Sequence, residues 1–253
     1  MSAFASAPLE WRDVLRVFRR PQSFTWPMAV LFVIMPGYLF MPAMFDDRTL
    51  HAPEIGLDRA LPLLSEWSFV YGSLFCVALL PAFVVQDEDL LDRTIKAYLA
   101  AWLVSFAFFF VYPTVAPAHP RVTGGGFADW GMRAIYGADV KYNCFPSLHV
   151  AQSFIAALAC YHVHRGVGKV ALVWAALVGV STLFTKQHYV LDVVAGAALG
   201  YCAYRAFVRG FPRERIPTVV RRAAPVLAAG AFLTYGLIVG TFWALYAFGV
   251  APG

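Results

Sequence analysis

The chain has 253 residues, of which 60% are hydrophobic and only 14% charged, whereas a soluble domain carries about 25% charged residues. This composition excludes a disordered chain, a coiled-coil rod and an ordinary cytosolic enzyme, and it predicts an integral membrane protein. The net charge is +5, but the basic residues flank apolar segments, so they indicate membrane topology and no nucleic-acid partner. The length suits a single membrane domain over 1–253.

The first predicted element is an amphipathic helix near the N-terminus. Within 11–20, apolar residues recur at the i, i+3, i+4, i+7 spacing of a helix, largely opposite four arginines. This pattern predicts a helix that lies in the membrane surface. The apolar residues are Trp11, Val14, Leu15 and Phe18. We assign 1–24 to a cytoplasmic interfacial helix.

Seven apolar segments follow, each near the roughly 20 residues that cross a bilayer as a helix. Their ranges are 25–44, 61–85, 95–113, 146–163, 168–185, 187–208 and 225–249. Pro36 and Pro42 predict kinks in the first segment, because each removes a backbone donor. The predicted fold class is all-α: a polytopic membrane helix bundle with a six-helix core over 25–208 and an extra C-terminal transmembrane helix over 225–249.

The distribution of basic residues predicts the orientation in the membrane. Fourteen of the 20 Lys and Arg residues fall on the side of the N-terminus. The positive-inside rule therefore makes the N-terminus cytoplasmic and the C-terminus exterior. Between the third and fourth segments, 114–145 is the longest stretch without an apolar run, and a loop of this length is usually functional.

Two segments at the exterior face carry polar groups in membrane-embedded positions, namely 141–151 and 181–196. In the second, His188 and Asp192 are four residues apart, so on a helix the carboxylate can orient the imidazole. The other ring nitrogen then becomes a better nucleophile or base. The same pair would also suit a purely structural role near the interface.

The first of these segments contains a predicted helix start. Pro146 and Ser147 are residue types found at the first turn and the N-cap. The N-terminus of a helix offers N–H groups and positive potential, which suits a phosphate group. His149 lies beside this position and could donate a proton to a leaving oxygen.

The segment FPSLH at 145–149 and the spacing of Ser181, His188 and Asp192 resemble the second and third motifs of the type-2 phosphatidic acid phosphatase (PAP2) superfamily. That superfamily contains membrane phosphatases and transferases. The resemblance implies a PAP2-like six-helix core over 25–208. It also implies that His188 attacks phosphorus, His149 protonates the leaving group and Asp192 orients the nucleophile. Ser147 and Ser181 are expected to bind the phosphate.

The chain departs from the phosphatase pattern at two places. Thr182 stands where that pattern has arginine, and no K-x6-RP motif precedes the long loop. Together with YPTVAP at 112–117, the third motif more closely resembles the inositol phosphorylceramide synthase branch, which moves phosphoinositol onto ceramide.

A phosphoryl transition state needs cations or oriented N–H groups near its oxygens. On the exterior side we expect Arg121, Lys186 and Lys141 to bind the phosphate, and each would also suit an interfacial anchor. We assign no chemistry to Cys144. The spacing of the four cysteines indicates neither a structural zinc site nor a disulfide framework.

The predicted function is a lipid phosphotransferase that works through a phosphohistidine and moves a phospho-headgroup to a lipid hydroxyl. The first alternative is a lipid phosphate phosphatase. Further alternatives are a zinc-dependent hydrolase that uses His149, His188 and Asp192 as ligands, and a non-enzymatic lipid carrier. We expect membrane lipids as partners, no metal and no cofactor, and a multi-pass protein of the bacterial inner membrane with its site at the exterior face.

Overall fold

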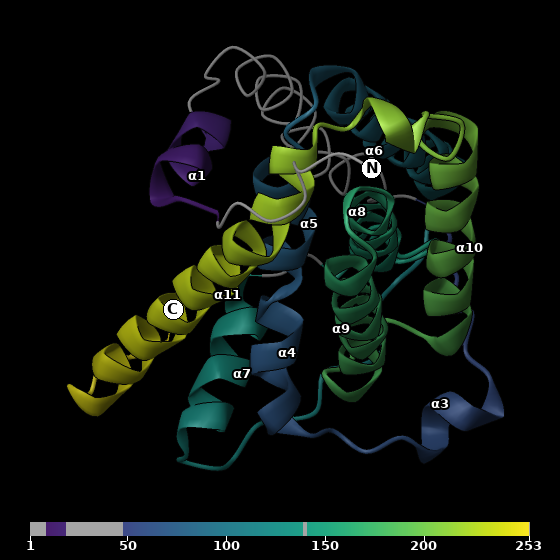
Figure 1. Ribbon diagram of the computed structural model, residues 1–253. Coiled ribbons are helices and arrows are strands. Elements are labelled where there is room, and N and C mark those ends of the chain that lie inside the picture. The colour runs from purple at the N-terminus through teal and green to yellow at the C-terminus, as the bar shows by residue number, and fades with distance from the viewer. Residues whose placement is uncertain (1–8, 19–47, 139–140, 253) are drawn as a thin grey trace.

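The computed structural model describes residues 9–18, 48–138 and 141–252. The predicted span 25–44, with Pro36 and Pro42, lies outside the described residues. Within the described part the regular elements are all helices, accompanied by two isolated β-bridges. Figure 1 shows these helices as a bundle, which confirms the all-α prediction.

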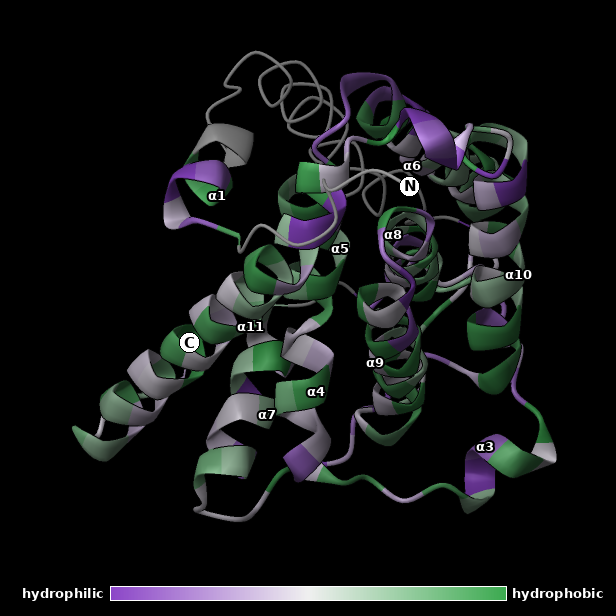
Figure 2. Cartoon of the chain, in the orientation of Figure 1, coloured by the Kyte–Doolittle hydropathy of each residue, from purple (hydrophilic) through white to green (hydrophobic). Residues whose placement is uncertain are grey.

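Five described helical segments are long and apolar enough to cross a membrane. The first, Ser65–Val84, is built from η3 (Ser65–Trp67), α4 (Ser68–Gly72) and α5 (Leu74–Val84). The other four are α6 (Glu88–Val111), α9 (Arg165–Phe184), α10 (Val190–Phe207) and α11 (Thr218–Ala247). They confirm an integral membrane protein and correspond to five of the predicted segments. In Figure 2 the ribbons of these helices are coloured mostly green to white, the hydrophobic and intermediate part of the scale.

Two helices begin earlier than predicted because their first turns are polar. The Asp87 side chain accepts a hydrogen bond from Leu90 N, so α6 begins at Glu88 and not at 95. The helix α11 begins at Thr218, and the predicted start at 225 falls on Pro225 inside it. Polar first turns are typical of helices that start at the membrane surface, and hydropathy alone does not find them.

The helix α8 (Leu148–Val163) lies at the centre of the bundle and packs against α5, α6, α9 and α10. With 16 residues it is shorter than the five segments above, about 24 Å at 1.5 Å per residue. Small side chains let neighbouring helices approach it closely. The buried ones are Ala151, Ser153, Ala156, Ala157, Ala159 and Cys160.

The expected loop over 114–145 contains a helix, α7 (Phe127–Ala138). It packs against η3 and α4, and Trp130 Nε1 donates to Val250 O beyond the end of α11. The prediction of a loop over 114–145 was therefore wrong for this part.

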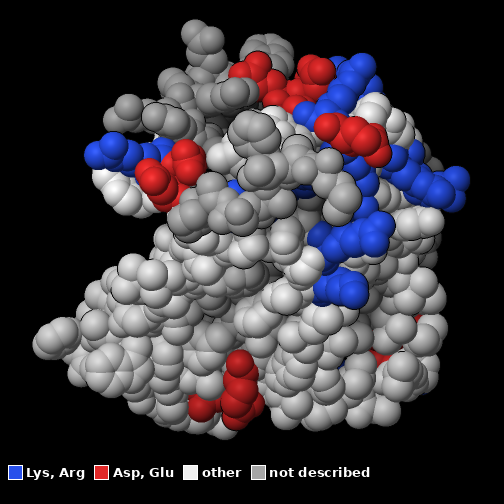
Figure 3. Space-filling view, viewed as in Figure 1, with Lys and Arg blue, Asp and Glu red and all other residues white. Residues whose placement is uncertain are grey.

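The described N-terminal helix, α1 (Trp11–Phe18), packs against α11. It confirms a helix inside the predicted element 1–24, whose interfacial position stays a prediction. A short helix, α3 (Gly56–Ala60), lies near the start of α10 (Figure 1). Lys and Arg gather at the opposite end of the molecule in Figure 3. There Arg165 begins α9, and Arg213 and Arg215 belong to η4 (Arg213–Arg215).

Candidate active site

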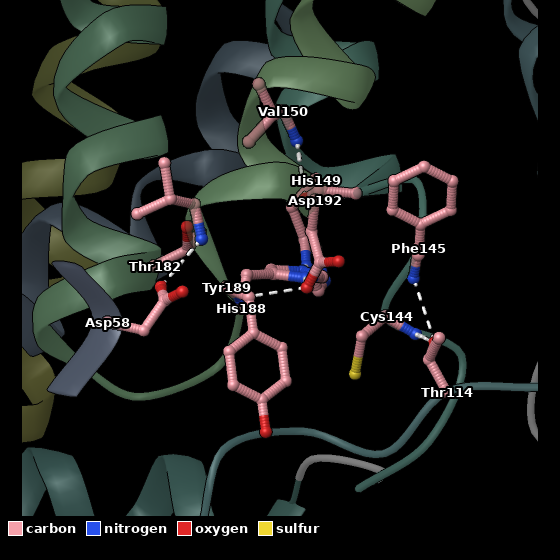
Figure 4. Close-up of polar contacts among 12 residues, drawn as sticks. Asp58, Thr114, Cys144, Phe145, His149, Val150, Thr182, His188, Tyr189 and Asp192 are labelled. Atoms are coloured by element: carbon pink, nitrogen blue, oxygen red, sulfur yellow. Dashed lines mark hydrogen bonds and ion pairs between the residues drawn. The ribbon is translucent and has the colours of Figure 1, made fainter. Parts of the chain in front are cut away.

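Two histidines and one aspartate form a hydrogen-bonded row between α8 and α10. Asp192 Oδ2 lies 3.3 Å from His188 Nδ1, and His188 Nε2 lies 3.0 Å from His149 Nδ1. Asp192 is fully buried and His188 is 5% exposed. Figure 4 shows the three side chains converging. The structure thus brings together the three residues that the sequence predicted as the reaction centre.

The carboxylate determines which nitrogen of His188 carries the proton. Because an ionised carboxylate can only accept, Nδ1 of His188 must donate to Asp192. The Nε2 atom then carries a lone pair, which accepts from His149 Nδ1. This tautomer is inferred from the hydrogen-bond network. It leaves a nucleophilic nitrogen on the side of His188 that faces His149.

Main-chain contacts hold the two motifs together. Ser147 N donates to the carbonyl of Asp192 at 3.1 Å, while the Ser147 side chain caps α8 by accepting from Val150 N. A Cβ atom added to Gly196 would lie 2.4 Å from Ser147 O, and one added to Gly200 would lie 2.6 Å from Ala151 O. Gly196 and Gly200, which have the spacing GxxxG, therefore allow α10 to pack closely against the start of α8 within the chain.

We expect Gly196→Ala to lower both stability and turnover. The new methyl group cannot fit against the Ser147 carbonyl, so α8 and α10 must move apart, at a cost of about 1–3 kcal/mol. The measurements are the unfolding temperature in detergent and the rate with a lipid phosphate substrate. Gly236→Ala on α11 is the matched control, because nothing lies within 4 Å of its added Cβ. Wild-type values for Gly196→Ala would contradict the tight α8–α10 contact.

Two residues that were not predicted from the sequence bind backbone N–H groups of the two motif segments. Asp58 in α3 accepts from Val190 N at 2.8 Å and so caps the start of α10. Thr114 Oγ1 accepts from Cys144 N at 2.9 Å and from Phe145 N at 3.0 Å, which fixes the segment before α8 (Figure 4). No local sequence signal marks either residue, because both contacts join segments distant in the chain.

The three predicted cations differ in their contacts. Lys186 adopts a φ of 58° and directs its ammonium group to the carbonyls of Asp58 and Leu61, at 3.3 and 2.6 Å. It therefore joins α3 to the loop before His188. Arg121 and Lys141 are exposed, and within the described part of the chain their side chains form no hydrogen bond or ion pair.

The two residues at the start of the third motif are bonded within their own helix. The Ser181 hydroxyl donates to Val178 O at 2.6 Å, and the Thr182 hydroxyl donates to Gly179 O at 2.7 Å. Both residues are fully buried. The Thr182 carbonyl accepts from Gln187 N and His188 N, which shapes the turn that presents His188. In this structure neither hydroxyl faces outward as a phosphate ligand.

Several buried polar atoms, in the row and in residues close to it in sequence, lack a hydrogen-bond partner among the described residues. They are Asp192 Oδ1, both amide atoms of Asn143, and Gln187 Nε2. Asn143 and Gln187 are each less than 5% exposed. An unsatisfied buried amide costs free energy, so such atoms next to a reaction centre are candidates for contact with substrate. Burial raises the pKa of Tyr189 to about 12, so its hydroxyl stays a neutral donor.

The geometry defines a membrane-embedded centre in which a buried carboxylate orients one imidazole toward a second. Comparison with models of protein families identifies the family to which the chain belongs. The model of the PAP2 superfamily matches residues 56–206, and the chain belongs to this superfamily. The matched range includes all three residues of the row: His149 on α8, His188 in the turn before α10, and Asp192 on α10.

Two curated relatives resemble parts of the chain. A PA-phosphatase related-family protein of Dictyostelium discoideum is 26% identical over 119 residues, which is 41% of this chain and 22% of that protein. The bacitracin transport permease protein BcrC of Bacillus licheniformis is 41% identical over 58 residues, which is 23% of this chain and 29% of that protein. The chain thus spans less than a third of the length of either relative. No solved structure matches it significantly.

Proposed function

We propose that the protein is a membrane enzyme that transfers a phospho-headgroup from a lipid phosphoester through a phosphohistidine at His188. The observation that carries this proposal is the row from Asp192 through His188 to His149, with contacts of 3.3 and 3.0 Å. A carboxylate that fixes the imidazole tautomer activates a histidine nucleophile. Membership in the PAP2 superfamily supports the same chemistry.

In the first half-reaction, His188 Nε2 attacks phosphorus and the bond to the leaving oxygen breaks. His149 donates a proton to that oxygen, so the donor lipid leaves as a neutral alcohol. Asp192 stabilises the imidazolium character that develops on His188. In the second half-reaction, an acceptor hydroxyl loses its proton to His149 and attacks phosphorus, and the bond to His188 Nε2 breaks.

The phosphoryl oxygens need donors, and the ammonium group of Lys186 already donates to the carbonyls of Asp58 and Leu61. The row lies at the N-terminus of α8, where N–H groups and the helix dipole favour an anion. The unpartnered Asn143 Nδ2 and Gln187 Nε2 are further N–H donors close in sequence to the row. We propose that these neutral donors bind the phosphate alongside any cation that moves in with substrate.

Substrate must separate the two imidazoles. An attacking nitrogen lies about 3 Å from phosphorus, and the general acid lies about 3 Å from the leaving oxygen. An in-line arrangement therefore places His188 Nε2 and the donating atom of His149 roughly 6 to 7 Å apart. The present distance between His188 Nε2 and His149 Nδ1 is 3.0 Å. We therefore propose that this arrangement is a resting state, in which His149 is hydrogen-bonded to the attacking nitrogen of His188.

Two acceptors are consistent with this mechanism, and a different observation favours each. A lipid hydroxyl is favoured by the resemblance of the third motif, with Thr182 in place of arginine, to inositol phosphorylceramide synthases. Water is favoured by the similarity to a PA-phosphatase related-family protein. We propose the lipid hydroxyl as acceptor and the phosphatase reaction as the alternative.

The test is mass spectrometry of lipids after incubation of the purified protein with phosphatidylinositol, phosphatidate, ceramide and diacylglycerol. A new phospholipid made from ceramide or diacylglycerol supports transfer to a lipid hydroxyl. Free phosphate or free inositol phosphate alone supports hydrolysis and contradicts the transferase. If no donor is consumed in the presence of detergent-solubilised lipids, phosphotransfer itself is excluded for these substrates.

We also propose that the site opens to the exterior face. Lys and Arg gather at the end where Arg165 begins α9, whereas His188 follows the other end of that helix, and basic ends face the cytoplasm. Sealed vesicles of known orientation test this with a membrane-impermeant, short-chain phosphate substrate. Turnover only when the face opposite the basic end is outside supports the orientation, and turnover only in inverted vesicles contradicts it.

A further inference from the structure

Cys144 lies beside the row but has no part in the mechanism above. The ligand atoms of Cys144, His188 and Asp192 all lie within 4.8 Å of one another, and all three residues are buried. Thr114 holds the backbone N–H of Cys144, and the turn after α9 and the first turn of α10 hold the other two residues (Figure 4). Thiol, imidazole and carboxylate are therefore fixed by three separate parts of the fold.

This donor set has the composition and spacing of a zinc site. Zinc binds sulfur at about 2.3 Å and nitrogen or oxygen at about 2.0–2.2 Å in tetrahedral geometry. Nitrogen and oxygen ligands of such an ion are then roughly 3.3 Å apart. His188 Nδ1 and Asp192 Oδ2 are already 3.3 Å apart. The Cys144 sulfur needs to approach by no more than about 1 Å, which a side-chain rotation can supply.

An independent observation also points to a ligand. Asp192 Oδ1 is buried and has no hydrogen-bond partner among the described residues, although a buried carboxylate oxygen normally has one. A divalent cation bound by both oxygens of the carboxylate would satisfy Oδ1, while Oδ2 stays near His188 Nδ1. Its two charges would be balanced by one thiolate and one carboxylate, so the ion and these two ligands together would carry no net charge in a buried site.

We propose that Cys144, His188 and Asp192 form a binding site for a soft divalent cation such as Zn²⁺, and that occupancy of this site inhibits the enzyme. The thiol of Cys144 loses its proton to solvent when it binds the ion. The Nδ1 proton of His188 moves to Nε2, because Nδ1 now donates its lone pair to the metal. The proton of His149 moves in turn from Nδ1 to its own Nε2, so that His149 Nδ1 accepts from His188 Nε2. Inhibition, which rests on the proposed function, follows because a protonated Nε2 cannot attack phosphorus.

The site is tested by spectroscopy, which requires no turnover. Co²⁺ is added to the purified full-length protein in detergent with a non-thiol reductant, and the near-ultraviolet thiolate-to-cobalt charge-transfer band is recorded. We expect a band that saturates at one Co²⁺ per chain and disappears when Zn²⁺ is added. Cys144→Ser should abolish it. Cys202→Ser is the matched control, because Cys202 is an exposed cysteine on α10, and this variant should keep the band.

A second arm measures inhibition. The rate of each variant is measured with added Zn²⁺ and divided by the rate of the same variant in strong chelator. The Zn²⁺ concentration for half-inhibition should rise at least about tenfold in Cys144→Ser. It should not rise in Cys202→Ser. A missing band in wild-type protein, or a band that survives Cys144→Ser in folded protein, overturns the proposal. A cobalt band in a protein without phosphotransfer activity would retain the site and reject only the proposed function.

Discussion

His188→Ala is expected to reduce turnover by about three orders of magnitude or more, while the protein still inserts and folds. The substitution removes the nitrogen that forms the covalent bond to phosphorus, and loss of a nucleophile in a comparable catalytic unit has effects of this size or larger. The measurements are the steady-state rate and rapid-quench trapping of labelled phosphoenzyme from a labelled lipid phosphate. Wild-type protein should give an acid-labile, base-stable label, and His188→Ala should give none.

His149→Gln is the matched variant for this experiment. His149 is proposed to donate the leaving-group proton, so its loss should slow cleavage of an alkyl phosphoester far more than cleavage of an aryl phosphoester, whose leaving group needs no proton. The phosphoenzyme should still form from the aryl substrate. A label that persists in His188→Ala, or a rate equal to wild type, would show that another residue is the nucleophile.

Asp192→Asn is expected to lower turnover by about two to four orders of magnitude, with little change in stability. Asparagine can still accept the hydrogen bond that Asp192 Oδ2 receives from Tyr189 N at 2.9 Å, so the helix start is preserved. Asparagine cannot stabilise the charge that develops on His188, and its amide group can favour the wrong tautomer of the His188 ring. The corresponding exchange in a serine-protease triad lowers kcat by about 10⁴. The turnover number measures the expected loss of catalysis, and the unfolding temperature in detergent measures the expected small change in stability.

Asp58→Asn provides the control for this prediction. Asp58 also caps α10, through Val190 N, yet its carboxylate does not bond to His188. We expect its turnover to stay within about tenfold of wild type. Stability should fall by about 1 kcal/mol, because Asp58 accepts from Val190 N and from Ile55 N with different oxygens and an amide has only one oxygen. Equal losses of turnover in the two variants would indicate that Asp192 acts only through helix capping and does not orient the nucleophile.

Local spacing made the reaction centre predictable. His188 and Asp192 belong to one short segment, and a helix places residues four apart on one face. Pro146 and Ser147 marked the start of α8 in the same way, and the structure begins that helix at Leu148. The lipid-facing helices were also predictable, because hydropathy measures the property that membrane insertion selects.

The remaining parts depend on contacts between distant segments. Lys186 was expected to bind phosphate, but its ammonium group contacts Asp58 and Leu61, more than 120 residues earlier in the chain. Cys144 looked inert from its spacing to other cysteines, because its neighbours in space are a histidine and an aspartate. The helix α7 was missed because its stabilising contacts come from η3 and α4 and not from its own sequence.

The hydrogen bond from Ser147 N to the carbonyl of Asp192 involves no side-chain atom. Any amino acid except proline at the first position, and any at the second, can form it. The contact that aligns the two imidazoles therefore does not depend on which side chains positions 147 and 192 carry. Its sensitive neighbour is Gly196, where any Cβ would meet the Ser147 carbonyl, so the alignment is controlled by the absence of a side chain and not by the presence of one.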